Sequence, residues 1–96
     1  MLRFDAIEVG DHVLEKIRTK HGVELEEVEE ACASRGRHAR RVRGGLVMVL
    51  GRTEDGRYLA SLLADVGDGT WRLVSARDMV THERRLYARH AAKGQR

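Results

Sequence analysis

The sequence predicts a single α+β domain in which two helices precede an antiparallel sheet and a third helix follows it. Apolar residues recur at helical spacing before residue 34, and glycine-containing turns then recur at regular intervals up to residue 69. The remaining segment is basic and amphipathic, as in a surface helix. With 96 residues, the chain has the length of one domain, so residues 1–96 are treated as a single unit.

The first third of the chain is expected to form a short strand and two helices. Residues 2–9 alternate between apolar and polar side chains, which is typical of a short edge strand. Asp11 is the expected N-cap of a helix over residues 12–20, and Gly22 ends that helix. A second helix over residues 24–33 has its apolar side chains on one face and its glutamates on the other. The short turn between the helices allows either a helical hairpin or a bent pair.

Four strands are expected in the middle of the chain, and we expect one face of their sheet to receive the helices. They cover residues 37–43, 46–52, 58–65 and 70–76. Turns at residues 44–45, 54–56 and 67–69 join them into an antiparallel meander. The segment Leu46-Val47-Met48-Val49-Leu50 is apolar on both faces, which predicts an interior strand.

The last helix is expected to run from residue 78 to about residue 92. Ser75 precedes Asp78 by three residues, which is capping-box spacing and makes Ser75 the expected N-cap. The junction between strand and helix brings Arg, Glu and Tyr side chains close together in space. These are groups that a metal-free nuclease needs around a phosphate: cations for the developing charge and a residue that moves a proton.

Charge is distributed unevenly along the chain. Residues 1–34 carry a net charge of −5, residues 35–52 carry +6, residues 53–71 carry −3 and residues 72–96 carry +5, for a total of +3. Two basic blocks that merge into one face would attract polyanions such as RNA. The alternative is a solvated surface in a chain that uses arginine more than lysine.

Several classes of protein are disfavoured by the sequence. The lone Cys32 cannot form an internal disulfide, and no apolar run approaches the length of a membrane span, so we expect a cytoplasmic protein that makes no contact with membranes. The five histidines show no metal-ligand spacing, so neither a metal nor a cofactor is expected. Cys32 lies on the apolar stripe of the second helix and is expected in the core, as is Trp71, although a tryptophan can also stack on a base.

Three segments match one known family in order and spacing. They are Lys20-His21-Gly22-Val23 with Glu26-Glu27-Val28, Gly51-Arg52-Thr53 with Gly56-Arg57-Tyr58-Leu59, and Val74-Ser75-Ala76-Arg77 with Glu83-Arg84-Arg85-Leu86-Tyr87. Together, across about residues 4–90, they resemble the BrnT-type toxins of bacterial type II toxin–antitoxin systems. That resemblance implies a RelE-like ribonuclease fold, with both N-terminal helices and the C-terminal helix packed on a four-stranded antiparallel sheet.

The resemblance also implies a function. The chain would be a metal-independent endoribonuclease that cuts mRNA through attack of the 2′-hydroxyl on the adjacent phosphate, and so slows growth. It would be neutralised by an antitoxin, usually of the ribbon–helix–helix type, encoded beside it. Promoter DNA would be bound only by the complex of the two proteins.

By the same resemblance, the expected catalytic residues are His21, Arg52, Arg77, Glu83 and Tyr87, and the expected RNA-binding residues are Lys20, Arg84 and Arg85. The two strand-end arginines would bind phosphate, and the His, Glu or Tyr would move protons. Structural alternatives stay open at each position. Arg77 is equally suited to pair with a carboxylate of the first two helices, and Lys20 and His21 to contact the carbonyls at a helix end. The ring of Tyr87 is suited to packing on the sheet.

Two features depart from the family pattern. The family's usual opening, a segment of the aromatic-Glu-Trp-Asp type, is reduced here to Phe4-Asp5 with no Trp. The residue after Ser-Ala-Arg is often Lys in the family, whereas Asp78 stands here and reverses a charge beside the expected site. The charge reversal at Asp78 and the absence of a clear acid–base pair support the alternative hypothesis, a catalytically inactive toxin-like module that binds a protein partner or nucleic acid through its basic face.

Overall fold

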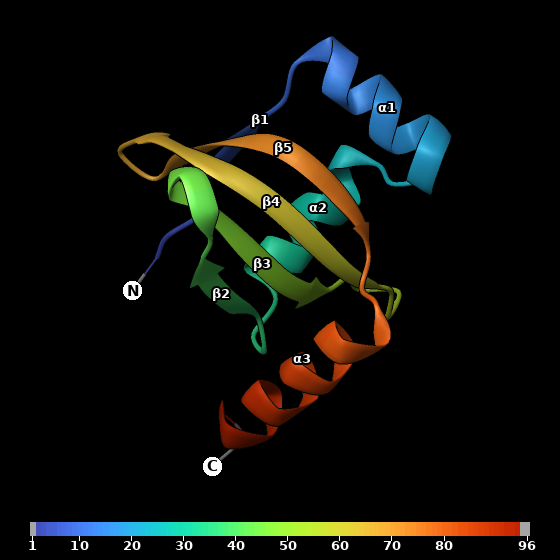
Figure 1. The fold of residues 1–96 in the computed structure, drawn as a ribbon, viewed down its shortest axis with the longest axis vertical. Helices are drawn as coiled ribbons and strands as arrows, with labels where there is room; N and C mark the ends of the chain where they lie inside the picture. Colours follow the sequence, from blue (N-terminus) through green and yellow to red (C-terminus); the bar gives the residue numbers. More distant parts are fainter. Residues whose placement is uncertain (1, 95–96) are drawn as a thin grey trace.

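The computed structural model describes residues 2–94 and shows a five-stranded sheet with three α-helices. Figure 1 shows α1 at one end of the molecule, α2 behind the strands in the middle, and α3 at the other end, beside β2 and β3. The elements in chain order are β1 (Ala6–Glu8), α1 (Asp11–His21), α2 (Leu25–Ala33), β2 (His38–Arg41), a 3₁₀ turn η1 (Arg43–Gly45), β3 (Leu46–Arg52), β4 (Tyr58–Gly67), β5 (Thr70–Asp78) and α3 (Thr81–Gly94).

The sheet has the order β1-β5-β4-β3-β2, and it is mixed. The antiparallel meander β2-β3-β4-β5 is confirmed, and β3 is interior as expected. The expected total of four antiparallel strands is wrong, because β1 adds a fifth strand that runs parallel to β5. The indole Nε1 of Trp71 donates to the carbonyl of Arg3 at 2.7 Å and fixes the segment that leads into β1.

The two N-terminal helices form a bent pair, in which α1 lies against β5 and α2 lies against β3 and β4. Gly22 ends α1 in the left-handed conformation, with φ of 61°. Asp11 was wrong as the N-cap, because Gly10 holds that position and Asp11 is the first helical residue, where its charge favours the helix dipole. Glu24 and Glu27 form a reciprocal capping box that starts α2.

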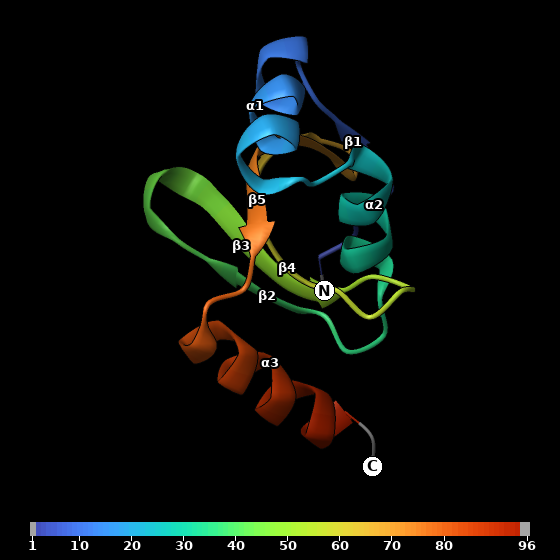
Figure 2. The same ribbon diagram turned by 90° about the vertical axis from the view of Figure 1, so that its right-hand side faces the viewer.

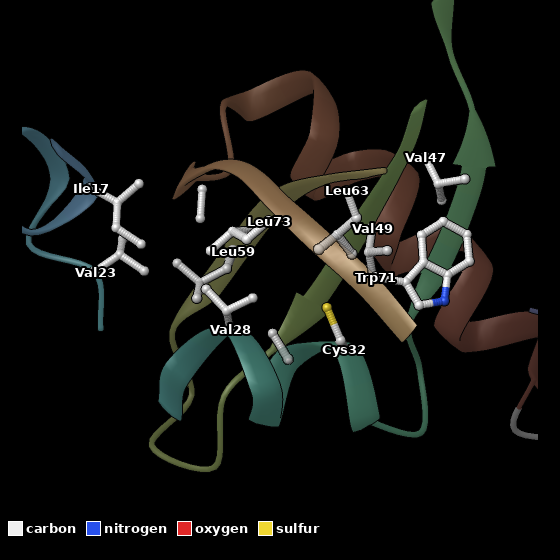
Figure 3. Packing of buried hydrophobic residues seen from close by; sticks show 12 residues of the cluster. Ile17, Val23, Val28, Cys32, Val47, Val49, Leu59, Leu63, Trp71 and Leu73 are labelled. Carbon is white, nitrogen blue, oxygen red and sulfur yellow. The ribbon is translucent and has the colours of Figure 1, made fainter. Parts of the chain in front are cut away.

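Helices cover both faces of the sheet, which corrects the expectation that one face receives them all. Figure 2 shows α1 and α2 on one side of the strands and α3 on the other. The larger core lies under α1 and α2, where Val28, Cys32, Leu63 and Trp71 pack together (Figure 3). A smaller core lies under α3 and includes Tyr87. Two cores follow from β3 and β4, whose successive side chains are apolar on both faces.

Cys32 and Trp71 are both 2% exposed, which confirms that they are core residues. Burial raises the pKa of the Cys32 thiol to about 12. Close packing of α2 on the sheet also explains Gly51, because a Cβ at that position would overlap the carbonyl oxygen of Ala31. The glycine of the Gly51-Arg52-Thr53 segment is therefore required by the contact between helix and strand.

The junction between β5 and α3 differs from the sequence prediction. Ser75 is not an N-cap, because it lies inside β5 and pairs with Leu62. The strand continues to Asp78, since β4 still offers Leu59 as a partner there. The helix begins at Thr81, and the Glu83 carboxylate accepts the Val80 backbone N–H at 3.0 Å. The carboxylate cap thus comes from inside the first helical turn.

Two kinds of feature are absent from residues 2–94, a membrane-spanning helix and a metal-binding cluster of side chains. Among residues 2–94, no helix is both long enough and apolar enough to cross a membrane. Within the same part of the chain, no cluster of three or more His, Cys, Asp or Glu side chains has the geometry to hold a metal ion.

Candidate active site

The candidate site lies where α3 meets the ends of β3 and β5. Successive side chains of a strand point to opposite faces, so Arg52 at the end of β3 and Arg77 near the end of β5 face α3. Helix α3 contributes Glu83, Arg84 and Tyr87 from its first two turns. The structure therefore brings five of the eight expected residues to one region.

Arg77 and Glu83 form the central ion pair of this region. Nη1 and Nη2 of Arg77 donate to the two carboxylate oxygens of Glu83 at 2.7 and 3.0 Å. The Glu83 side chain is 15% exposed and the Arg77 side chain 37%. The bond to Arg77 lowers the pKa of Glu83, so this carboxylate is ionised at neutral pH. The partner of Arg77 is thus on α3, and the expected alternative of a carboxylate on the first two helices is wrong.

The ion pair leaves part of the Arg77 guanidinium available. Nη1 also donates to the carbonyl of Asp78 at 3.2 Å, so three of the five N–H donors have acceptors among residues 2–94. The Nε–H and one Nη2–H remain, and they lie on the same edge of the guanidinium plane. That edge has the fork geometry that binds two oxygens of a phosphate while Glu83 holds the other edge.

Tyr58, the first residue of β4, is the aromatic centre of the site and has no role in the sequence prediction. The guanidinium of Arg84 lies 4.3 Å from its ring centroid and that of Arg52 lies 5.2 Å away. The ring also meets Tyr87 edge-on, with 5.7 Å between centroids. Two arginines are therefore held at one aromatic ring by cation–π attraction. Tyr58 belongs to the Gly56-Arg57-Tyr58-Leu59 segment noted in the sequence. Its contact with Arg52, however, follows only from the cross-strand pairing of the two residues.

Tyr87 is 9% exposed and belongs to the smaller core. A Cβ at Gly36 would lie 3.0 Å from the Tyr87 hydroxyl, so the loop between α2 and β2 packs directly against that hydroxyl. The Tyr87 ring therefore packs on the sheet, which is the structural alternative that the sequence offered for this residue. The neighbouring Arg85 is exposed on α3.

Lys20 and His21 lie apart from this cluster, in the last turn of α1. Arg57 fixes that turn, because Nη2 donates to the carbonyl of His21 and Nη1 to that of Gly22, each at 2.8 Å. The same guanidinium contacts Glu27 of α2 at 3.2 Å and Asp78 of β5 at 2.7 Å. Arg57 thus ties two helices and a strand together on the face opposite α3.

Asp78 belongs to this second cluster. It follows Arg77 in β5 and points to the opposite face, where Arg57 lowers the pKa of its carboxyl. The expectation that Asp78 reverses a charge beside the Arg77 site was wrong, because strand alternation separates the two side chains. Asp78 serves as a partner for Arg57.

Comparison with known proteins gives a likeness of fold. No family model matches the sequence, and no curated protein matches it. Among solved structures, the chain is similar to the Brucella abortus ribonuclease toxin BrnT, with a TM-score of 0.66 and 14% sequence identity. The match covers 84% of this chain and 100% of the toxin. The likeness in fold agrees with the family resemblance of the three sequence segments.

Proposed function

We propose that the chain is a BrnT-type toxin of a type II toxin–antitoxin system and acts as a metal-independent endoribonuclease. The observation that carries the proposal is the pair of arginines at Tyr58, Arg52 and Arg84, on the same face of the sheet as the ion pair of Arg77 with the ionised Glu83. An arrangement of this kind has cations for a phosphate and a carboxylate that accepts a proton. The fold shared with a ribonuclease toxin supports the same function.

In the proposed reaction, the 2′-hydroxyl of a ribose attacks the adjacent phosphorus, and the bond to the 5′-oxygen of the next nucleotide breaks as water protonates that oxygen. Arg77 would bind the phosphate through its Nε–H and free Nη2–H. Glu83 would take the hydroxyl proton, and it also positions Arg77. A phosphate that shares the Arg77 charge would make Glu83 more basic than in the free protein. Arg52 and Arg84 would stabilise the extra negative charge.

The alternative hypothesis, an inactive binding module, loses one of its two supports in this arrangement. That support was the charge reversal at Asp78, and Asp78 lies on the face opposite Arg77 with Arg57 as its partner. Proton transfer by His21 has less support than transfer by Glu83, because α1 packs on the other face of the sheet.

The direct test is cleavage of a short single-stranded RNA by the purified chain in the presence of EDTA. We expect products that end in a 2′,3′-cyclic phosphate, and no cleavage where the 2′-hydroxyl is replaced by hydrogen. Arg77→Lys keeps a positive charge but loses the fork, and we expect a rate at least about 100-fold lower. Arg72→Gln is the matched control, since Arg72 lies on the same strand and pairs with Glu8 instead.

Glu83→Gln separates two roles for the carboxylate. The amide oxygen can still accept the Val80 N–H and one Arg77 N–H, so α3 and Arg77 keep their positions. If Glu83 accepts the proton, the variant loses activity and the acid limb of the pH–rate profile disappears. An unchanged profile would leave Glu83 as a positioning residue only. Absence of cleavage by folded wild-type protein would favour the binding module.

We also propose an antitoxin partner, of the ribbon–helix–helix type, that the chain meets in the cell. Induction of the chain in a bacterium that lacks the partner gene should arrest growth and deplete mRNA, and Arg77→Ala should abolish both effects. Co-expression of a short open reading frame adjacent to the gene should restore growth. Normal growth on induction of soluble wild-type chain would contradict the toxin proposal.

A further inference from the structure

A second basic region lies away from Arg77, at the edge strand β2. It is a hollow of about 750 Å³, lined by Leu2, Phe4, Arg35, Arg37, Ala39, Arg41 and His90. Its volume falls in the range of ligand sites in proteins, about 300–1,000 Å³. Figure 1 shows that the N-terminal segment and α3 both lie beside β2. The hollow therefore has walls from three separate parts of the chain.

The cations of this hollow have no acidic partners in the part of the chain that the structure describes. The ion pairs among residues 2–94 involve none of Arg35, Arg37 and Arg41, and no Asp or Glu lines the hollow. The guanidinium of Arg37 donates to the carbonyl of Ser34 at 3.2 Å, so it is partly positioned. Three arginines held around an apolar floor suit a phosphate together with a sugar or base.

Two features connect the hollow to the candidate active site. The backbone N–H of Arg52 donates to Ser34 Oγ at 3.3 Å, one residue before Arg35, and His90 of the hollow lies on α3 with Glu83. Glu83, Tyr87 and His90 follow the i, i+4, i+7 spacing of a single helical face. At 1.5 Å per residue, Glu83 and His90 are separated along the helix by roughly 10 Å. Gly36 packs on Tyr87 and Ala91, so its neighbours in the sequence, Arg35 and Arg37, are held close to this face.

We propose that this hollow binds a second phosphate of a single-stranded RNA whose reacting phosphate lies at Arg77. The inference rests on the proposed ribonuclease function. Arg35 and Arg41 would contact the phosphate, and the apolar floor, with Phe4, would contact the attached nucleoside. The hollow would thus extend the substrate path beyond the reacting bond, and its contribution would require an RNA long enough to reach from Arg77 to β2.

The test measures binding of a ten-nucleotide RNA that carries 2′-O-methyl groups throughout and so cannot be cleaved. Fluorescence anisotropy gives the Kd of the wild type and of an Arg35→Gln/Arg41→Gln double variant at several salt concentrations. Both side chains are exposed, so the fold should tolerate the change, which circular dichroism verifies. An Arg18→Gln/Arg72→Gln double variant removes the same charge from exposed sites elsewhere.

We expect the Kd of the Arg35/Arg41 variant to rise about tenfold, as for removal of one charge-assisted hydrogen bond. Its salt dependence, as the slope of log K against log salt, should be shallower by about 0.7 for each phosphate that the variant no longer neutralises. The Arg18/Arg72 control should change the Kd less than about twofold. For a dinucleotide, which does not reach the hollow, the wild type and the Arg35/Arg41 variant should bind equally.

Three outcomes would overturn the proposal. Equal losses of affinity in both double variants would mean general charge attraction, and no loss in either would mean that the hollow does not meet RNA. Unchanged RNA affinity with weakened binding of a polyglutamate peptide would assign the hollow to a protein partner.

If wild type cleaves RNA but the Arg35/Arg41 variant binds normally, this inference fails alone. If wild type neither binds nor cleaves RNA, the proposed function fails as well.

Discussion

Replacement of Arg57 by methionine should destabilise the fold more than loss of any exposed ion pair. Arg57→Met keeps the aliphatic stem and removes the guanidinium, whose side chain is 27% exposed. The two bonds to backbone carbonyls contribute about 1–3 kcal/mol together. The ion pairs with Glu27 and Asp78 add about 0.5–2 kcal/mol after screening by solvent, since Asp78 is 63% exposed. The expected loss of stability is about 3 kcal/mol.

Thermal and urea unfolding, followed by circular dichroism, measure this loss. For a domain of this size a change of about 3 kcal/mol lowers Tm by roughly 12–24 °C. Arg72→Met is the matched control, because Arg72 contacts Glu8 alone and its side chain is 63% exposed. That variant should lose less than about 1 kcal/mol. A loss below about 1 kcal/mol for Arg57→Met would refute the view that this side chain joins α1, α2 and β5.

The variant Asp78→Asn tests how the contribution of the Arg57–Asp78 contact to stability depends on pH. Arg57 lowers the pKa of Asp78 in the folded protein, so the contribution is present above the pKa of the unfolded chain, near 3.8. This contribution is lost as the pH falls through the pKa that Asp78 has in the folded protein. The free energies of unfolding of Asp78→Asn and wild type should therefore differ at pH 7 and converge at acid pH. RNA cleavage by Asp78→Asn should stay within a few-fold of wild type, and a decrease like that of Arg77→Lys would place Asp78 in the site.

Three further substitutions test the packing and charge of the fold. Gly51→Ala should lower the free energy of unfolding by about 1–3 kcal/mol or prevent folding, because its methyl group would overlap the carbonyl of Ala31. Urea unfolding measures this loss of stability. Ser61→Ala should raise stability by about 1 kcal/mol, because among residues 2–94 the Ser61 hydroxyl is buried with no hydrogen-bond partner; a lower Tm would contradict this. Burial and the nearby His90 lower the pKa of His38 below its usual 6.5, so the folded state disfavours the charged ring. Stability should therefore fall as the pH drops below about 6.5, and less so in His38→Gln.

Much of the fold was predictable because local pattern determined it. Glycine at residue 22 marks the end of α1 through contacts within a few residues. The glutamates at residues 24 and 27 cap α2 through equally local contacts, but that pair was not identified from the sequence. The meander followed from glycine turns between apolar runs. The end of β5 was not predictable in this way, because Ser75 has the local features of a helix cap and its strand pairing depends on residue 62, thirteen positions earlier.

The candidate site was predictable in its residue types but not in its partners. Arg77 and Glu83 are six residues apart, and their pairing needs the turn between β5 and α3 that brings them together. The separation of Asp78 from Arg77 follows from strand alternation, but only once residue 78 is known to be in a strand. The roles of Arg57 and Tyr58 depend on contacts with residues far along the chain.

The parallel pairing of β1 with β5 has a consequence for the order of folding. Ala6 pairs with Thr70, so the first strand has no partner in the sheet until most of the chain has been synthesised. Hairpins such as that of β3 and β4 close over short loops and form quickly, whereas this pairing closes a loop of more than sixty residues. Docking of β1 should therefore be a late step, and a nascent chain would expose the outer edge of β5 to other proteins until that step is complete.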